Sequence, residues 1–367
     1  MIEIFQPQAL SAARLDILLS GGWFRSSSSI SRLQYLCMNG EIGSVVNIRA
    51  MLDNYPISKG FRKILSQNKR RFNYIVRKVT PIDEAKERLY QLQKEKFDIF
   101  IMDSLHTFLY DYSNPAYSIF NTYEVCVYDG DRLIAVSFFD VGIRSVASII
   151  GLYDTDYQKY SLGTFTLLLE IEFARLHGFS CFYPGYILLK EKSIAFEYKL
   201  RLANLQFRDK QGIWRPISEL RQEDWVHLQF QEQKKQITQY LDSIKVDFQY
   251  ILYPYFSVAK FIDYYQCVMM PAFFCIGILD REAILRGKKL LIIEHLIEQG
   301  LYRIGYVSML SDILVAIMTG NIELSQEIKD SEAYLLTPLK YEEILLESTD
   351  WEKAQEVIKK EIAFAIQ

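Results

Sequence analysis

Residues 160–199, YSLGTFTLLLEIEFARLHGFSCFYPGYILLKEKSIAFEYK, join a glycine turn, a long apolar run and an aromatic segment. The run after Gly163 is rich in Leu, Phe, Ile, Glu and Ala, and Gly178 follows it. A start signal, about four turns of helix formers and a terminal glycine predict a helix here. Because apolar residues occur nearly all round this helix, we expect it to pack against a sheet. Residues 179–183 then predict a strand.

Strand-like segments precede this helix. Residues 124–128 and 133–140 show the pattern of strands, and residues 146–153 supply a third. The dipeptide Asp129-Gly130 between the first two is a strong hairpin signal. Three strands, a long helix and a further strand predict an α+β fold. This is also the core order of the acetyltransferase-like (GNAT) fold, a central mixed sheet with flanking helices.

The composition is that of a globular protein without a marked overall charge. Half of the 367 residues are hydrophobic, and 42 Lys and Arg stand against 45 Asp and Glu. Whole-chain charge therefore does not indicate a nucleic-acid binder, any basic surface must be local, and we expect no DNA partner. Five cysteines without a CxxC pair favour free thiols in a reducing cytoplasm. No secretory signal opens the chain, and charged residues interrupt the most membrane-like segment, 251–279, so we expect a cytoplasmic protein without membrane contact.

Several segments of this region resemble one known family. Ser161–Phe165, Glu170–Arg175 and Tyr183–Tyr186 together resemble the C-terminal signature of the aminoacyl-tRNA–protein transferases. These are the arginyl-transferases and their bacterial leucyl-transferring relatives. Ala195–Lys199 and Gly212–Trp214 resemble the lysine-tyrosine segment and closing tryptophan of the same family. The resemblance implies a GNAT-like fold for this part of the chain.

A fainter resemblance to the family covers the first eighty residues. Leu15–Ser26 looks like its N-terminal stretch, and Pro56–Lys63 looks like its basic segment. Between them the family normally places a cysteine cluster with a CxxC, whereas this chain keeps only Cys37. Since one thiolate cannot hold a metal or an iron–sulfur cluster without partners, we expect neither here. The missing cysteines leave open whether this part keeps the family's chemistry.

The resemblance implies a specific reaction. An amino acid, Arg or Leu, would pass from its charged tRNA to the N-terminal α-amine of proteins that begin with Asp or Glu, which tags them for degradation. Aminoacyl-tRNA is then the co-substrate, and no other cofactor is expected. The ester is already activated and an α-amine has a pKa of about 7.7–8, so positioning and oxyanion donors can supply the catalysis. The four histidines form no recognisable catalytic arrangement.

Three polar side chains are the candidate catalytic residues. Glu172 matches the family's glutamate and could take the amine proton or orient the amine, but it could equally pair with Arg175 on the helix surface. Tyr183 and Tyr186 could bind the ester carbonyl or stack the terminal adenine, or simply pack in an aromatic core. Glu170 replaces the family's usual glutamine, so we infer no role for it.

The candidate substrate-binding residues lie in the matching segments. A helix start offers free N–H groups to an anion, and the basic segment from residue 59 to 78 could contact tRNA phosphates or be a solvated helix and strand. The candidates are Trp23, Arg25, Arg62, Lys63, Ser161, Gly163, Thr164, Gly185, Tyr198 and Lys199.

The chain divides into four predicted parts. Residues 1–80 form an N-terminal family domain, 81–120 a helical connector and loop, 121–216 the GNAT-like catalytic domain, and 217–367 a mostly α-helical C-terminal extension. The last part shows amphipathic helical patterns. They cover residues 225–244, 256–270, 281–299, 307–318 and 351–365.

Two other functions remain open at this point. A GNAT acyltransferase with another donor is one, although the usual acyl-CoA pyrophosphate loop is not cleanly present around residues 157–163. A non-catalytic relative that binds protein or RNA is the other, favoured by the missing cysteines and opposed by the retained SLGT and YPGY segments. The sequence decides neither the donated amino acid nor the oligomeric state.

Overall fold

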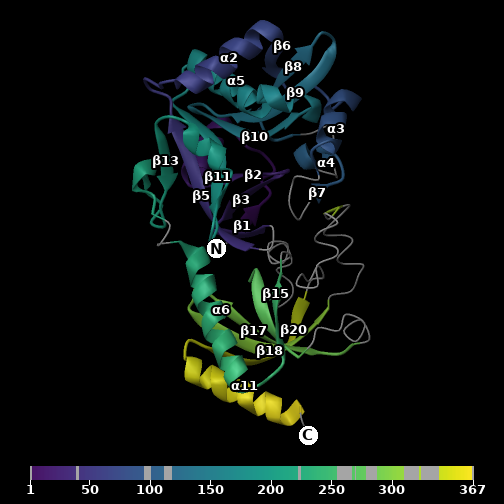
Figure 1. Cartoon of the computed structure of the whole chain (residues 1–367), viewed down its shortest axis with the longest axis vertical. Helices are drawn as coiled ribbons and strands as arrows, with labels where there is room; N and C mark the ends of the chain where they lie inside the picture. Colours follow the sequence, from purple (N-terminus) through teal and green to yellow (C-terminus); the bar gives the residue numbers. More distant parts are fainter. Residues whose placement is uncertain are drawn as a thin grey trace.

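A computed structural model of the chain contains two stacked bodies, and helix α6 leads from one to the other (Figure 1). The N-terminus lies near their junction and the C-terminus at the far end of the second body (Figure 1). The structure describes residues 2–38, 41–94, 101–110, 118–221, 225–253, 267–268, 270–277, 287–309, 322–323 and 339–365.

A large mixed sheet forms the centre of the first body. Its strand order is β14-β13-β5-β11-β10-β9-β8-β6, with β4 added to β5 and β12 to β11. All pairs along this order are antiparallel except β10 and β11. The strands are β4 Tyr35–Met38, β5 Glu41–Met51, β6 Asn73–Lys78, β8 Thr122–Asp129, β9 Arg132–Val141, β10 Ser145–Tyr153, β11 Cys181–Leu189, β12 Ile194–Ala195, β13 Leu205–Arg208 and β14 Trp214–Pro216.

The predicted hairpin and helix are both present. β8 and β9 pair across Asp129-Gly130, and Gly130 has a positive φ of 59°. Helix α5 (Leu162–Leu176) follows the 3-10 helix η2 (Thr155–Tyr160) and ends before Gly178, which has a φ of 74°. α5 buries Phe165, Leu168 and Ile171 against the sheet, as its apolar pattern predicts.

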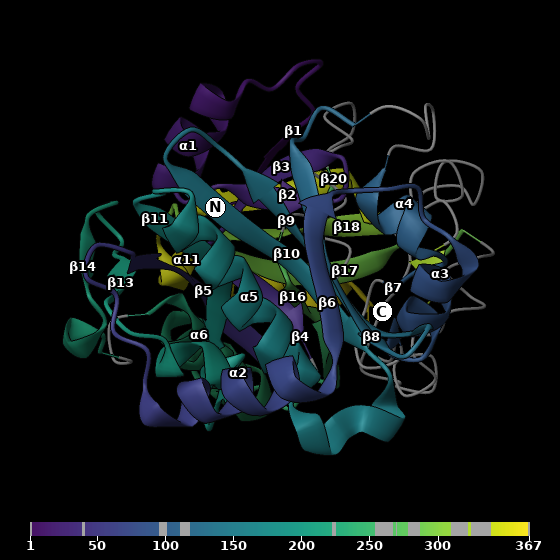
Figure 2. The same cartoon turned by 90° about the horizontal axis from the view of Figure 1, so that it is seen from above.

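Helices cover both faces of this sheet. α2 (Lys59–Arg71) lies beside α5 over the same face, as Figure 2 shows from above. α3 (Glu84–Gln91) and α4 (Leu105–Leu109) cover the other face through a separate apolar cluster. β5 and β6 come from the first eighty residues, so that segment and residues 121–216 build one sheet together.

A small sheet and one helix complete the first body. The strands β1 (Ile2–Phe5), β2 (Phe24–Ser26) and β3 (Ser29–Leu33) pair antiparallel in the order β1-β3-β2. α1 (Ala12–Ser20) buries Leu15, Leu18 and Leu19. Two short 3-10 helices, η3 (Glu197–Arg201) and η4 (Ile217–Glu219), lie in the later connections, and β7 (Ile101–Met102) pairs with β19 (Ile322–Glu323).

The second body is built around an antiparallel sheet of order β15-β16-β17-β18-β20. One face packs on α6 (Val226–Ser243) and α11 (Trp351–Ala365), and the other packs on residues of the first body. The strands are β15 Phe248–Leu252, β16 Ala272–Ile276, β17 Leu290–Leu296, β18 Leu301–Met309 and β20 Leu339–Ser348.

The prediction of a mostly α-helical C-terminal extension is therefore wrong. The two outer helices, 225–244 and 351–365, are confirmed as α6 and α11. The pattern at 281–299 contains β17, and that at 307–318 begins within β18. A short apolar run bounded by glycines has no period that separates strand from helix, and here neighbouring strands supply its hydrogen bonds. The remaining predicted helix, 256–270, lies almost wholly outside the described residues.

Among the helices that the structure describes, none is both long and apolar enough to cross a bilayer.

Candidate functional site

The large sheet opens between its two parallel strands. β10 and β11 pair only from Ser145 to Ala147 and from Cys181 to Tyr183. Just beyond, the register of β10 against β9 shifts between residues 148 and 150, and that of β11 against β5 shifts between residues 182 and 185. Irregularities of this kind bend a strand away from its neighbour. Both strands continue past the last shared pair, so they diverge into a split.

A cavity of about 350 Å³ lies where α5 meets β9 and β10 beside this split. Its lining comes from β9, β10, η2, α5 and η3. The lining residues are Ser137, Ser148, Gly151, Tyr153, Gln158, Ser161, Gly163, Thr164, Thr166, Leu167, Glu170 and Tyr198. Most of them offer a hydroxyl, an amide or a backbone group, so polar groups make up about half of the cavity wall.

The start of α5 forms one end of the cavity. Ser161 has a left-handed backbone, with φ of 53°, and its side chain does not cap the helix. The first N–H groups of a helix have no partner within the helix and favour an anion. Gly163 and Thr164 line the cavity at this point. Three of the predicted substrate-binding residues thus lie together where a phosphate or carboxylate could be held.

Glu170 lies two turns further along α5 and is the one acidic side chain in the cavity lining. It is fully buried, and neither carboxyl oxygen makes a hydrogen bond of normal geometry with the described residues. Burial raises the pKa of this carboxyl to about 8, and the nearby hydroxyls of Ser137 and Ser148 oppose that rise only in part. The sequence missed Glu170, because nothing local to it shows that distant strands enclose it in a cavity.

Tyr198 and Lys199 stand on η3 beside the split. Tyr198 lines the cavity with half of its surface exposed, and burial together with the charge of Glu170 raises its pKa. Lys199 Nζ donates to the Tyr186 carbonyl oxygen at 3.1 Å and lies beside the Gly185 backbone. Burial lowers the pKa of Lys199 to about 8. Gly185 has a φ of 91°, a conformation that favours glycine.

The three predicted catalytic residues lie outside this cavity. Glu172 forms an ion pair with Lys69 at 2.5 Å, in place of the pair with Arg175, and lines a second cavity of about 910 Å³ beside α2. Tyr183 is buried edge-on against Trp214, with ring centroids 5.8 Å apart.

Tyr186 likewise packs among aromatic rings. Its centroid lies 5.2 Å from that of Phe24 and 5.6 Å from that of Phe196, and burial raises its pKa to about 12. Both tyrosines thus make aromatic packing contacts, and a direct catalytic role for either stays a prediction.

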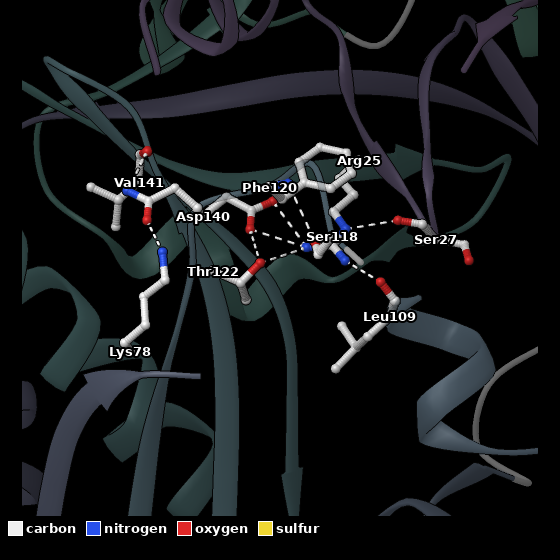
Figure 3. Close-up of polar contacts among 10 residues, drawn as sticks. Arg25, Ser27, Lys78, Leu109, Ser118, Phe120, Thr122, Asp140 and Val141 are labelled. Carbon is white, nitrogen blue, oxygen red and sulfur yellow. Dashed lines mark hydrogen bonds and ion pairs between the residues drawn. The ribbon is translucent and has the colours of Figure 1, made fainter. Parts of the chain in front are cut away.

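Arg25 reaches from β2 into the large sheet (Figure 3). Its Nη1 lies 3.1 Å from Asp140 Oδ1 and 3.0 Å from Thr122 Oγ1, and its Nε donates to the Ser27 carbonyl oxygen at 2.7 Å. The guanidinium also bonds the Leu109 carbonyl. The side chains of Arg25 and Asp140 are only 4% and 2% exposed. These contacts make Arg25 a link between the small and large sheets.

The other N-terminal candidates separate into two groups. Trp23 packs on Phe5 with ring centroids 5.1 Å apart, under the guanidinium of Arg32. Arg62 and Lys63 are exposed on α2, on a helix that ends in three consecutive basic residues. α2 is tied to the start of α5, since Asn68 Nδ2 donates to the Tyr160 carbonyl oxygen at 2.9 Å. The basic helix therefore lies next to the end of the cavity that the start of α5 forms.

No three His, Cys, Asp or Glu side chains of the described residues are grouped as a metal site requires. Cys37 is buried and is not part of a disulfide. A site without metal or cofactor stays a prediction.

Comparison with known proteins finds one family for the central segment of the chain. Residues 75–209 match the family model for the C terminus of arginine-tRNA-protein transferase. An aspartate/glutamate leucyltransferase of Campylobacter jejuni is 27% identical over 189 residues, 49% of this chain and 74% of that protein. One from a Shewanella species is 26% identical over 200 residues, 53% of this chain and 79% of that protein. Residues 75–209 are therefore similar to the aminoacyl-tRNA–protein transferase family, as the sequence motifs in this segment predict.

Similar solved structures are more distant. A Bacillus licheniformis L-PGS is 13% identical and has a TM-score of 0.31, covering 42% of this chain and 48% of that chain. A tandem GNAT protein of the clavulanic acid pathway is 10% identical and has a TM-score of 0.26, covering 53% and 55%. At these values the likeness carries no argument about fold or function.

Proposed function

We propose that this protein transfers an amino acid, Arg or Leu, from charged tRNA to the N-terminal α-amine of proteins that begin with Asp or Glu, and so marks them for degradation. The observation that supports this most is the cavity between the start of α5 and the β10–β11 split, within the segment that matches the family. Relatives named aspartate/glutamate leucyltransferase are consistent with such acceptors.

We also propose that the first body has a GNAT-like fold. Its mixed sheet with one parallel pair, the divergence of that pair and the helix beside the split agree with the predicted order of elements. In such a site the split would receive the reacting groups and the start of α5 would hold an anion. Function is argued from this site and not from the fold.

The proposed chemistry needs no metal and no added cofactor. The neutral amine nitrogen attacks the ester carbonyl carbon, a peptide C–N bond forms and the C–O bond to the ribose breaks. The amine proton leaves and the ribose oxygen departs as a hydroxyl. Because an α-amine with a pKa of about 7.7–8 is partly neutral near pH 7, placing it against the ester supplies much of the rate. Backbone N–H groups along the divergent strands are the proposed oxyanion donors.

The basic helix α2 is the proposed contact for tRNA. Arg62, Lys63, Arg70 and Arg71 are exposed along it, and the Asn68 contact fixes the helix beside η2 and the start of α5. Phosphates of the acceptor end could therefore lie on α2 while the last phosphate reaches Gly163 and Thr164. tRNA as co-substrate is also the reason to propose a cytoplasmic location.

A transfer assay tests this function. Purified protein would be incubated with total charged tRNA, labelled amino acids and a reporter peptide with N-terminal Asp, and the product analysed by mass spectrometry. We expect one added residue that depends on intact tRNA, and none on an N-acetylated reporter. No product under conditions where a known leucyltransferase works would overturn the proposal. Acylation that requires CoA would instead identify a GNAT acyltransferase with another donor.

A further inference from the structure

Glu170, which lines the cavity, is a buried acidic residue without an ion-pair partner among the described residues. Its carboxyl is fully enclosed, yet no Lys, Arg or His of those residues pairs with it, and its two oxygens make no hydrogen bond of normal geometry with them. The hydroxyls of Ser137 and Ser148 lie close enough to lower its pKa in part, but Ser137 Oγ likewise makes no hydrogen bond of normal geometry with the described residues. Buried polar groups are normally hydrogen-bonded, and an exception can mark a functional group that a ligand or water satisfies. Two such groups facing one cavity indicate a ligand with several donors.

The rest of the lining limits what that ligand can be. Leu167 is its only aliphatic side chain, whereas hydroxyls come from several strands and from α5. An apolar side chain placed here would leave the carboxyl and hydroxyls without partners. The free-energy cost of these unpaired groups exceeds the gain from an apolar contact with Leu167. A guanidinium has five N–H donors in a rigid fork and suits a carboxylate flanked by hydroxyls.

We propose that Glu170 is the specificity-determining residue that binds the cationic side chain of the donated amino acid, so that this protein prefers arginine over leucine. This inference rests on the proposed function. Glu170 lies six residues beyond Thr164, about 9 Å along the helix. A donor whose phosphate sits at the start of α5 would thus extend its side chain along α5 to Glu170, with the ester beside the split.

The surroundings of Glu170 couple its protonation to the charge of the bound side chain. The groups that face it are the hydroxyls of Ser137 on β9 and Ser148 on β10 and the phenol of Tyr198 on η3. Burial favours the protonated carboxyl at neutral pH, because it disfavours the charged form. A bound guanidinium favours the carboxylate, so an arginyl donor should release a proton on binding and a leucyl donor should not.

The first test compares donors in wild type and in Glu170→Gln, which keeps the shape and removes the charge. With tRNA charged with arginine, we expect kcat/KM to fall ~100-fold in the variant, as for loss of a buried charged hydrogen bond. With leucine the change should stay within about threefold, since no such bond is made. tRNA charged with citrulline, the neutral analogue of arginine, should be a poor donor for wild type.

A matched variant and a binding measurement exclude a merely structural effect. Glu197→Gln removes an exposed acid next to Tyr198 that does not line the cavity, and it should behave as wild type. Calorimetry with a non-hydrolysable 3′-arginylamido adenosine, in buffers of different ionisation enthalpy, should show release of nearly one proton. The Glu170→Gln variant should show none.

The outcomes separate the two proposals. No transfer from any charged tRNA by wild type overturns the proposed function and this inference together. Transfer that prefers leucine overturns the inference alone. Equal losses for both donors in Glu170→Gln also overturn it, because the carboxyl would then bind an α-ammonium that every donor or acceptor carries.

Discussion

At the scale of single residues, two buried carboxyls, those of Asp140 and Glu170, differ in their polar partners. Asp140 is satisfied by Arg25 and Thr122, whereas Glu170 makes no ion pair and no hydrogen bond of normal geometry with the described residues. The first therefore stabilises the fold, and the second carries a burial cost that protonation lowers and a bound cation would offset. Both claims can be measured on the free protein.

The Arg25–Asp140 pair predicts a loss of stability without a loss of tRNA binding. Arg25→Met leaves the Asp140 carboxyl buried without its cation, which typically costs ~3–5 kcal/mol. Urea unfolding followed by circular dichroism should therefore show a lower midpoint with an unchanged slope. If the midpoint stays and the KM for charged tRNA rises instead, Arg25 contacts the substrate, as its sequence position suggested.

Glu170 predicts a pH-dependent difference in stability. Its folded-state pKa of about 8 lies above its usual value of 4.5. Between these values the native state holds a proton that the unfolded state has lost, so the free energy of unfolding falls as pH rises through this window. Glu170→Gln cannot ionise and should gain stability over wild type as pH rises, by up to ~4 kcal/mol near pH 8.

Unfolding in urea from about pH 5 to about pH 8 measures this difference. Glu197→Gln, exposed and outside the cavity, should show no such trend. A constant difference between wild type and Glu170→Gln over the whole range would mean that folding does not raise the pKa of this carboxyl, contrary to its burial.

At the scale of elements, local signals explain which parts of the fold could be predicted. α5 has its apolar run, its start and its terminal glycine within eighteen residues, so its ends were read correctly. β17 is a strand because it pairs with β16 and β18. The residues of β17 themselves carry no signal of that pairing. The cavity has the same origin, since strands far apart in the chain enclose Glu170.

The basic helix α2 predicts the salt dependence of tRNA use. Neutralising Arg62 and Lys63 together with Gln should raise the KM for charged tRNA and lower the slope of log KM against log salt by about 1–2. Steady-state assays at several salt concentrations measure this. The pair Lys359→Gln and Lys360→Gln, equally exposed on α11, should leave the slope unchanged. If the two double variants changed the slope equally, tRNA would be attracted by the overall charge of the protein and α2 would not be a specific contact.

At the scale of the whole molecule, the two bodies share one apolar cluster. Leu188 of β11 and Tyr35 of β4 pack with Phe273 and Ile292 of the second sheet. Ser44 Oγ lies 3.0 Å from His227 Nδ1 and accepts the His227 backbone N–H at 2.9 Å, which fixes the start of α6 to β5. Because β11 also forms the split, the second body supports the strand on which the candidate site depends.

Leu188→Ala tests whether packing against the second body stabilises β11. Leu188 is fully buried, and truncating it should cost ~2–5 kcal/mol through lost contacts and a cavity between the bodies. Hydrogen exchange measured by mass spectrometry should then show lower protection in both β11 and β17, because the cluster contains residues of both strands. Leu176→Ala is the matched control, since that side chain is 84% exposed and should change stability by less than about 0.5 kcal/mol. Loss of protection confined to β17 would mean that the first body holds β11 in place by itself, and the second body would then need another role.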